Sequence, residues 1–412
     1  MDKLSLYTQR YRDFCFIFLF TFPIFSLKIV TISFVVFSVL TLLLFFIERP
    51  KFIKKDLFFY LLFILPFLPY LFEYCFFSDN PVIRFELEKK ILFFITPVIF
   101  YISSLLGKPL SYFSALKTYV ISVSIFSVCY FIILFFSGIM FSNNAYLNGS
   151  YELRTFFENI SGLHPTYYGL FSTTASLFIV FYFHKFSRNI KLILVFFLFF
   201  NVLLGFLIAS KMPLIILIFG LFYLAYFKSK SKLQFGGIVL VILSCLFFLS
   251  NILPSFHSRV LETISFYSNP GINNTLIERN AILFCSKAVF WQDFFTGVGA
   301  RNSQFLLDYC YLYFGFNKGF VSHFNSHNQF LTLGISYGIG VVFLFVSLFG
   351  IVFYKLRHNT AAVIFLFSSF VIMLTESILE RQIGIYFFLF LGLLFLQAVK
   401  KANNHSVLSN TR

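Results

Sequence analysis

Charged residues are scarce in this sequence, and acidic residues most of all. Of 412 residues only 12% are charged, with 16 Asp and Glu against 32 Lys and Arg. A soluble domain of this length needs a far more polar surface to stay in solution. The shortage of charge therefore excludes an ordinary soluble enzyme.

Motifs for metals and nucleotides are missing as well. The sequence has six cysteines but no C-x-x-C pattern, no H-E-x-x-H pattern and no Walker loop. We therefore expect no metal, no cofactor and no ATP. Cys285 and Cys310 share one hydrophilic stretch. An oxidising compartment would permit a bridge between them, but the sequence leaves open whether they are joined.

Apolar residues fill most of the chain. They make up 59% of the sequence, with 69 phenylalanines and a mean hydropathy of +0.87. Runs of about 20 apolar residues recur along the chain, and each is long enough to cross a bilayer as a helix. We predict an all-α polytopic membrane protein with about twelve transmembrane helices. The predicted spans are residues 14–25, 29–46, 57–72, 91–106, 119–140, 165–183, 192–208, 212–227, 236–253, 328–354, 361–377 and 385–399.

The net charge of +16 fits this topology without nucleic acid. With the N-terminus in the cytoplasm, the basic clusters at residues 51–55, 228–232 and 400–401 all fall inside, as the positive-inside rule requires. Twelve spans place both termini in the cytoplasm. The predicted organisation is residues 1–253 as about nine spans, 254–327 as one long, partly helical periplasmic loop, and 328–412 as about three spans with a cytoplasmic tail.

Basic residues and a histidine gather at the predicted outer surface. Ser210 and Lys211 lie in a short turn between two spans, and Arg279 follows Thr275 and Glu278, which read as a helix capping box. The remaining positions are Arg301 in "GVGARNS", and His327 and Asn328 at the start of the tenth span. Arginine and lysine bind phosphate oxygens, and histidine takes up a proton near neutral pH. These residues suit a membrane-held diphosphate substrate.

Each residue also has an ordinary structural explanation. His327 would serve as a helix cap, and Lys211 as a turn charge that reaches the headgroups. Arg279 in a first helical turn would be a solvated side chain. The two glycines of "GVGARNS" would simply make a turn.

The sequence resembles the O-antigen ligase and polymerase superfamily. The resemblance rests on "ERNAILFCSKAVF", "FFTGVGARNSQF" and "SHNQFLTLGISYGIGVVFLF", which occur in the order that the family shows. It extends to "LIASKMPLIIL", "GLHPTYYGLF" and "TESILERQIGIYFF", and so covers roughly the C-terminal 250 residues. Where the family usually has Ser-Arg, this chain has Ser210 and Lys211.

The resemblance implies a metal-independent, inverting glycan transfer at the periplasmic face of the bacterial inner membrane. The donor would be a glycan on undecaprenyl diphosphate, and the acceptor lipid A–core or a growing glycan. His327 would be the base, Arg279 the diphosphate ligand and Lys211 the second cation. His164 and Glu376 would bind the acceptor or join helices.

Our first expectation is an O-antigen ligase. A polymerase that extends the lipid-linked glycan and a protein O-oligosaccharyltransferase share the same motifs. A transporter of lipid-linked sugars or ions is the non-enzyme alternative. Transporters usually carry ionisable groups at mid-membrane and show repeated halves, whereas the charges of this chain lie at the ends of the spans.

Overall fold

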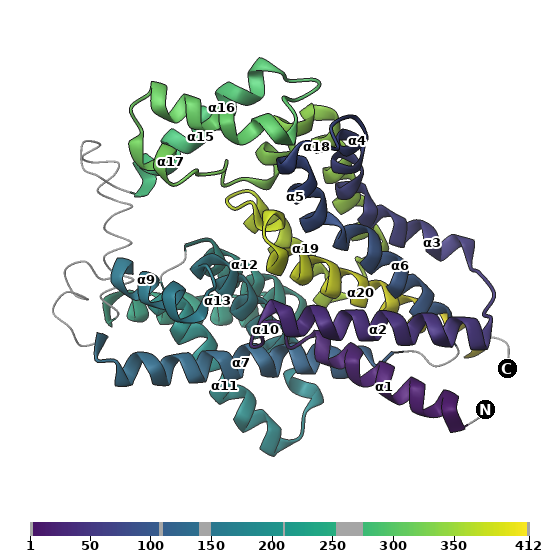
Figure 1. Cartoon of the computed structure of the whole chain (residues 1–412). Coiled ribbons are helices and arrows are strands. Elements are labelled where there is room, and N and C mark those ends of the chain that lie inside the picture. The colour runs from purple at the N-terminus through teal and green to yellow at the C-terminus, as the bar shows by residue number, and fades with distance from the viewer. Residues whose placement is uncertain (1–2, 107–109, 140–149, 209–210, 253–274, 410–412) are drawn as a thin grey trace. The chain divides into compact units, whose positions relative to one another are not determined.

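The computed structural model describes residues 3–106, 110–139, 150–208, 211–252 and 275–409, and Figure 1 shows them as helices joined by short connections. No strand occurs in these ranges, which confirms the all-α prediction. Two compact units divide the chain. We call Met1–Thr118 with Glu278–Arg412 the terminal unit, and Tyr119–Ile277 the central unit.

The terminal unit packs around its last helix. Almost every side chain of α20 between Ile385 and Phe395 is fully buried, as expected for a helix that is apolar on all sides. The helices of this unit are α1 (Lys3–Leu19), α2 (Leu27–Glu48), α3 (Lys54–Leu61), η1 (Leu62–Phe67), α4 (Leu68–Phe76), α5 (Pro81–Lys90), α6 (Leu92–Leu105), α15 (Thr275–Gln292), α16 (Ala300–Tyr313), α17 (Asn317–Val321), α18 (Gln329–Leu356), α19 (Thr360–Met373), η4 (Ile378–Glu380) and α20 (Gln382–Ser409).

The central unit packs around α10 (Pro165–Tyr182), which is buried along nearly its whole length. Around it lie α9 (Ser150–Ser161), η3 (Phe183–Lys185), α11 (Arg188–Leu207), α12 (Lys211–Lys228) and α13 (Lys232–Ile252), and α7 (Tyr112–Phe136) enters from the terminal unit. Ser127, Tyr168 and Asn201 join α7, α10 and α11 by buried hydrogen bonds. Such side-chain bonds hold apolar helices together where lipid gives no hydrophobic drive.

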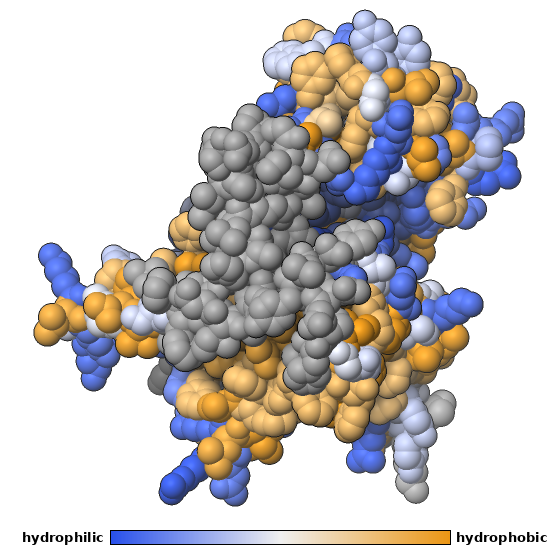
Figure 2. Space-filling view, turned by 90° about the vertical axis from the view of Figure 1, so that its left-hand side faces the viewer, coloured by the Kyte–Doolittle hydropathy of each residue, from blue (hydrophilic) through white to orange (hydrophobic). Residues whose placement is uncertain are grey.

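Seven helices in the described ranges are long and apolar enough to cross a membrane. Figure 2 agrees: apolar residues cover broad areas of the face that it shows. Each of the twelve predicted spans overlaps one of the helices above. The predicted ends at residues 140 and 253, and the first part of the predicted loop, lie outside the described residues.

Helix α18 is broken in its N-terminal half. Gly338 has φ 77° and ψ 177°, a conformation that is essentially restricted to glycine. The break exposes backbone groups that the loop before α16 binds. Val298 N–H donates to Ile335 O at 2.8 Å, and Gly299 N–H donates to Ser336 O at 2.9 Å. Ile339 N–H donates in turn to Phe294 O at 2.9 Å. Part of "GVGARNS", through Val298 and Gly299, therefore hydrogen-bonds to the broken turn of α18.

Candidate functional site

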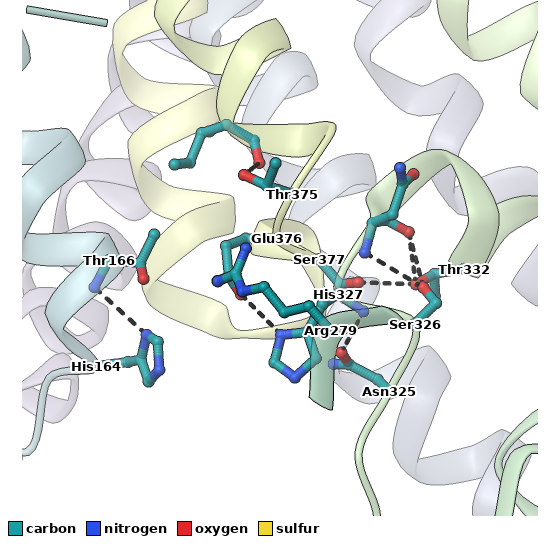
Figure 3. A network of polar contacts seen from close by, with 12 residues as sticks. His164, Thr166, Arg279, Asn325, Ser326, His327, Thr332, Thr375, Glu376 and Ser377 are labelled. Atoms are coloured by element: carbon teal, nitrogen blue, oxygen red, sulfur yellow. Dashed lines mark hydrogen bonds and ion pairs between the residues drawn. The ribbon is translucent and has the colours of Figure 1, made fainter. Parts of the chain in front are cut away.

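One carboxylate of the terminal unit binds both a guanidinium and an imidazole. Arg279 Nη2 donates to Glu376 Oε1 at 2.9 Å, and His327 Nδ1 lies 3.0 Å from Glu376 Oε2 (Figure 3). Arg279 comes from α15, His327 precedes α18, and Glu376 follows α19. The structure thus joins the two predicted catalytic residues through a residue that the sequence placed only among the weaker candidates.

The geometry of the imidazole suits a proton acceptor. As a carboxylate, Glu376 can only accept a hydrogen bond, so Nδ1 of His327 donates to it. Nε2 then carries the lone pair on the other side of the ring. His327 is partly exposed, while Glu376 is buried. A buried acid behind a partly exposed histidine fixes both its tautomer and its orientation.

The backbone at His327 is held in an unfavourable conformation. Its φ is 45°, in the left-handed region that costs ordinary residues about 1 kcal/mol. The side chain of Asn325 accepts the His327 N–H at 3.0 Å and supports the turn. Strain of this kind persists only where the surroundings impose it, and it concentrates at functional sites.

The alternative role of His327 as a helix cap is wrong. Asn328 is the N-cap of α18, and its side chain accepts from Leu331 N–H at 3.0 Å. The Asn328 amide also donates to Leu374 O at 2.8 Å. Asn328, a predicted substrate ligand, therefore links the start of α18 to the segment that carries Glu376.

An ion pair between buried Lys90 and partly buried Glu380 supports the same segment. Lys90, on α5, bonds Leu379 O and lies 2.8 Å from Glu380 Oε2. Gln329 donates to Glu380 Oε1 at 3.1 Å and accepts Leu379 N–H at 2.8 Å. Burial alone would raise the pKa of Glu380, but the Lys90 ammonium and these hydrogen bonds outweigh it and hold that pKa below its usual value.

His323 resembles His327, but the carboxylate that it contacts is not shared with an arginine among the described residues. Its φ is 47°, and its Nδ1 lies 2.7 Å from Asp308 Oδ2. Its side chain is 67% exposed against 28% for His327. No arginine shares the Asp308 carboxylate among the described residues. The two histidines therefore form a matched pair for experiment.

The helix that carries Arg279 is covalently tied to its neighbour. Cys285 of α15 and Cys310 of α16 form a disulfide, which settles the question that the sequence left open. The helix begins at Thr275 and its cap lies outside the described residues, while Glu278 pairs with Lys318 at 2.7 Å. That pairing is not the capping interaction predicted for Glu278.

The other predicted site residues are distributed over both units. Arg301 packs on Phe77, with its Nε 4.0 Å from Glu73 Oε1. In the central unit, the His164 side chain accepts Thr166 N–H at 3.4 Å and caps α10 (Figure 3). Lys211 is the first residue of α12. Ser210 lies outside the described residues.

Sequence reasoning missed the buried support of the site. Lys90 and Glu380 had no predicted role, and Gln329 was only part of the predicted span 328–354. Gln329 itself gave a hint, because a polar side chain at the start of an apolar helix often has a polar partner.

Among the described residues, no group of three or more His, Cys, Asp or Glu side chains could hold a metal ion. Comparison with protein-family models and with curated proteins gives no match. The function must therefore be argued from these residues and their geometry.

Proposed function

We propose that the terminal unit carries the catalytic site of a glycan transferase of the O-antigen ligase kind. The observation that carries the proposal is the carboxylate of Glu376, shared by Arg279 and His327. It sets a candidate base and a candidate phosphate ligand at a fixed spacing, as a transfer from a diphosphate carrier requires.

In the proposed reaction, Nε2 of His327 removes the proton from an acceptor hydroxyl. The acceptor oxygen attacks the anomeric carbon of a glycan on undecaprenyl diphosphate, and the bond from that carbon to the diphosphate oxygen breaks. The electron pair leaves with the diphosphate, whose charge Arg279 stabilises. Because attack and departure occur on opposite sides of the carbon, the transfer inverts its configuration.

Arg279 has the capacity for this role. Its side chain is exposed, and its only ion pair with a described residue is the one to Glu376. The guanidinium has five N–H donors in a planar fork, so most of them remain for phosphate oxygens. Lys211 is proposed as a second cation on the resemblance alone.

The proposal includes the topology. Twelve spans would place both termini in the cytoplasm of a bacterial inner membrane, with the site at the periplasmic face. The disulfide between Cys285 and Cys310 supports this side for α15 and α16, since disulfides persist in oxidising compartments. Residues 275–327 would then lie outside the membrane.

A purified transfer assay with undecaprenyl-diphosphate-linked glycan tests the function. We expect Arg279→Lys to lose at least about tenfold in rate, because the charge stays but the fork is lost. Arg84→Lys, at an exposed position of α5, is the control and should keep full rate. Full activity of Arg279→Ala at normal protein level would remove Arg279 from the site.

The acceptor decides between the members of the family. Transfer to lipid A–core identifies a ligase, transfer to a second lipid-linked glycan a polymerase, and transfer to a protein hydroxyl an oligosaccharyltransferase. No product with any of these acceptors, from protein that binds the donor, would reject the transferase proposal in favour of transport.

A further inference from the structure

A cavity of about 550 Å³ opens beside the broken helix of the terminal unit. Its walls are the apolar side chains of α4, the loop before α16, and α18 near Gly338. Two charged residues line it, Glu73 and Arg301. Arg279, His327 and Glu376 do not line it, so it is separate from the candidate catalytic site.

Two helices place this cavity at one surface of the membrane. The candidate span Asp56–Phe76 ends at the cavity wall. In α18, residues 339–356 beyond the break would be about 27 Å long, close to the thickness of a bilayer core. At the far ends of both, Lys355 Nζ lies 4.3 Å from the centre of the Phe59 ring. The cavity is therefore at headgroup depth on the opposite surface.

Of the two charged side chains in the cavity, Arg301 is the one that can bind an anionic group. Glu73 is buried, and its Oε2 accepts Ala300 N–H at 2.9 Å, so its charge is directed at the start of α16. The Cζ atom of Arg301 lies over the Phe77 ring, 3.4 Å from its centre. The guanidinium donates no side-chain hydrogen bond to a described residue, and its contact with Glu73 is long, at 4.0 Å.

The cavity is continuous with the lipid-facing side of α4. Phe72 and Phe76 line it, yet they are 69% and 65% exposed on a helix that is apolar enough to cross the membrane. An occupant with apolar chains can therefore enter from the bilayer. A small soluble anion would gain nothing from these walls.

We propose that this cavity binds a phospholipid of the surrounding bilayer, with its phosphodiester on Arg301 and an acyl chain along Phe72 and Phe76. An arginine packed on an aromatic ring keeps its N–H edges for phosphate oxygens. The depth of the cavity matches that of lipid phosphates. The inference does not depend on the proposed transferase activity.

Native mass spectrometry of the detergent-purified full chain tests the proposal, with phosphatidylglycerol titrated against diacylglycerol of the same chains. We expect one tightly bound phospholipid and at least roughly fivefold weaker binding of diacylglycerol, the worth of one arginine at a lipid surface. Arg301→Gln should weaken phospholipid binding by the same factor, and Arg301→Lys by less. Arg84→Gln, on α5, is the matched control and should bind as the wild type does.

Folding is checked separately by the thermal unfolding midpoint without added lipid. If Arg301→Gln unfolds early, Phe72→Ala serves instead. Its side chain is mostly exposed, so it should fold normally and still bind phospholipid more weakly. Equal binding of diacylglycerol and phosphatidylglycerol, or equal loss in the Arg301 and Arg84 variants, would overturn the proposal.

Discussion

At the scale of single residues, His327 and His323 can be compared directly. Both lie in the left-handed region, and both pair Nδ1 with a carboxylate. Asparagine tolerates that backbone conformation better than most residues, so either histidine can be replaced by Asn without adding strain. What differs is that only the carboxylate at His327 also binds Arg279.

We predict that His327→Asn lowers the transfer rate by about 10² to 10⁴, the usual worth of a general base. His323→Asn should retain nearly the full rate. The measurement is the initial rate of purified protein with lipid-linked donor, normalised to donor bound. If the two variants are equally active, His327 is not the base.

The ion pair of Lys90 and Glu380 makes the stability of the folded protein depend on pH. The pKa of Glu380 is lowered in the folded protein. Its contribution to stability is therefore fully present above the unfolded value, about 4.3, and disappears as pH falls through the folded value. We predict that the thermal unfolding midpoint of wild type falls more steeply below pH 5 than that of the Lys90→Met, Glu380→Gln double variant.

The comparison of unfolding curves between pH 6 and pH 3 checks this prediction. Replacing both partners avoids leaving one buried charge unpaired, which by itself is strongly destabilising. Parallel curves for the two proteins would show that another carboxylate controls acid stability.

At the scale of elements, the break in α18 organises the contacts between this helix and the loop before α16. A Cβ at Gly338 would lie 2.0 Å from Phe295 O, a backbone atom that cannot rotate away. At Gly340, two residues on, a Cβ would meet nothing within 4 Å. The two glycines are thus near neighbours with opposite requirements.

We predict that Gly338→Ala strongly destabilises the protein or prevents its folding. Gly340→Ala should be neutral or stabilising by up to about 1 kcal/mol, as alanine for glycine in a helix usually is. Thermal unfolding in detergent measures both. If the Gly338→Ala protein has the same thermal unfolding midpoint as the wild type, the pairing of α18 with residues 294–299 is dispensable.

Elements were easier to predict from this sequence than the contacts between them. Each of the twelve predicted spans overlaps a helix, because burial in lipid demands long uninterrupted apolar segments. The bounds differ most at the first span, which begins eleven residues after α1 does, and at the third, which covers parts of α3, η1 and α4. Seven helices in the described ranges are long and apolar enough to cross a membrane, so the count of twelve stays a prediction. Arg279 and His327 were found through motif order. The role of Glu376 as their common partner was not, since it depends on how α15, α18 and α19 pack. The same is true of the pair Lys90 and Glu380, 290 residues apart.

At the scale of the whole molecule, charge and redox chemistry both agree with the orientation that we propose. Lys54 and Lys55 begin α3, and Lys355 lies in the last turn of α18, as expected for cytoplasmic ends. The disulfide of Cys285 and Cys310 lies in the segment predicted outside. These two signals are independent, because one concerns insertion and the other concerns oxidation after insertion.

We predict opposite labelling of two exposed positions by a membrane-impermeant maleimide. Val321→Cys, in α17, should react in intact cells, whereas Lys230→Cys, between α12 and α13, should react only after lysis. The background replaces Cys15, Cys75, Cys129 and Cys245 by serine and keeps the disulfide pair, so that only the introduced thiol reports. Since both positions are exposed, a difference between them reflects the side of the membrane and not burial. Reaction of Lys230→Cys but not Val321→Cys in intact cells would show that the orientation is opposite to the proposed one. Arg279, His327 and Glu376 would then lie on the cytoplasmic side, away from a periplasmic donor.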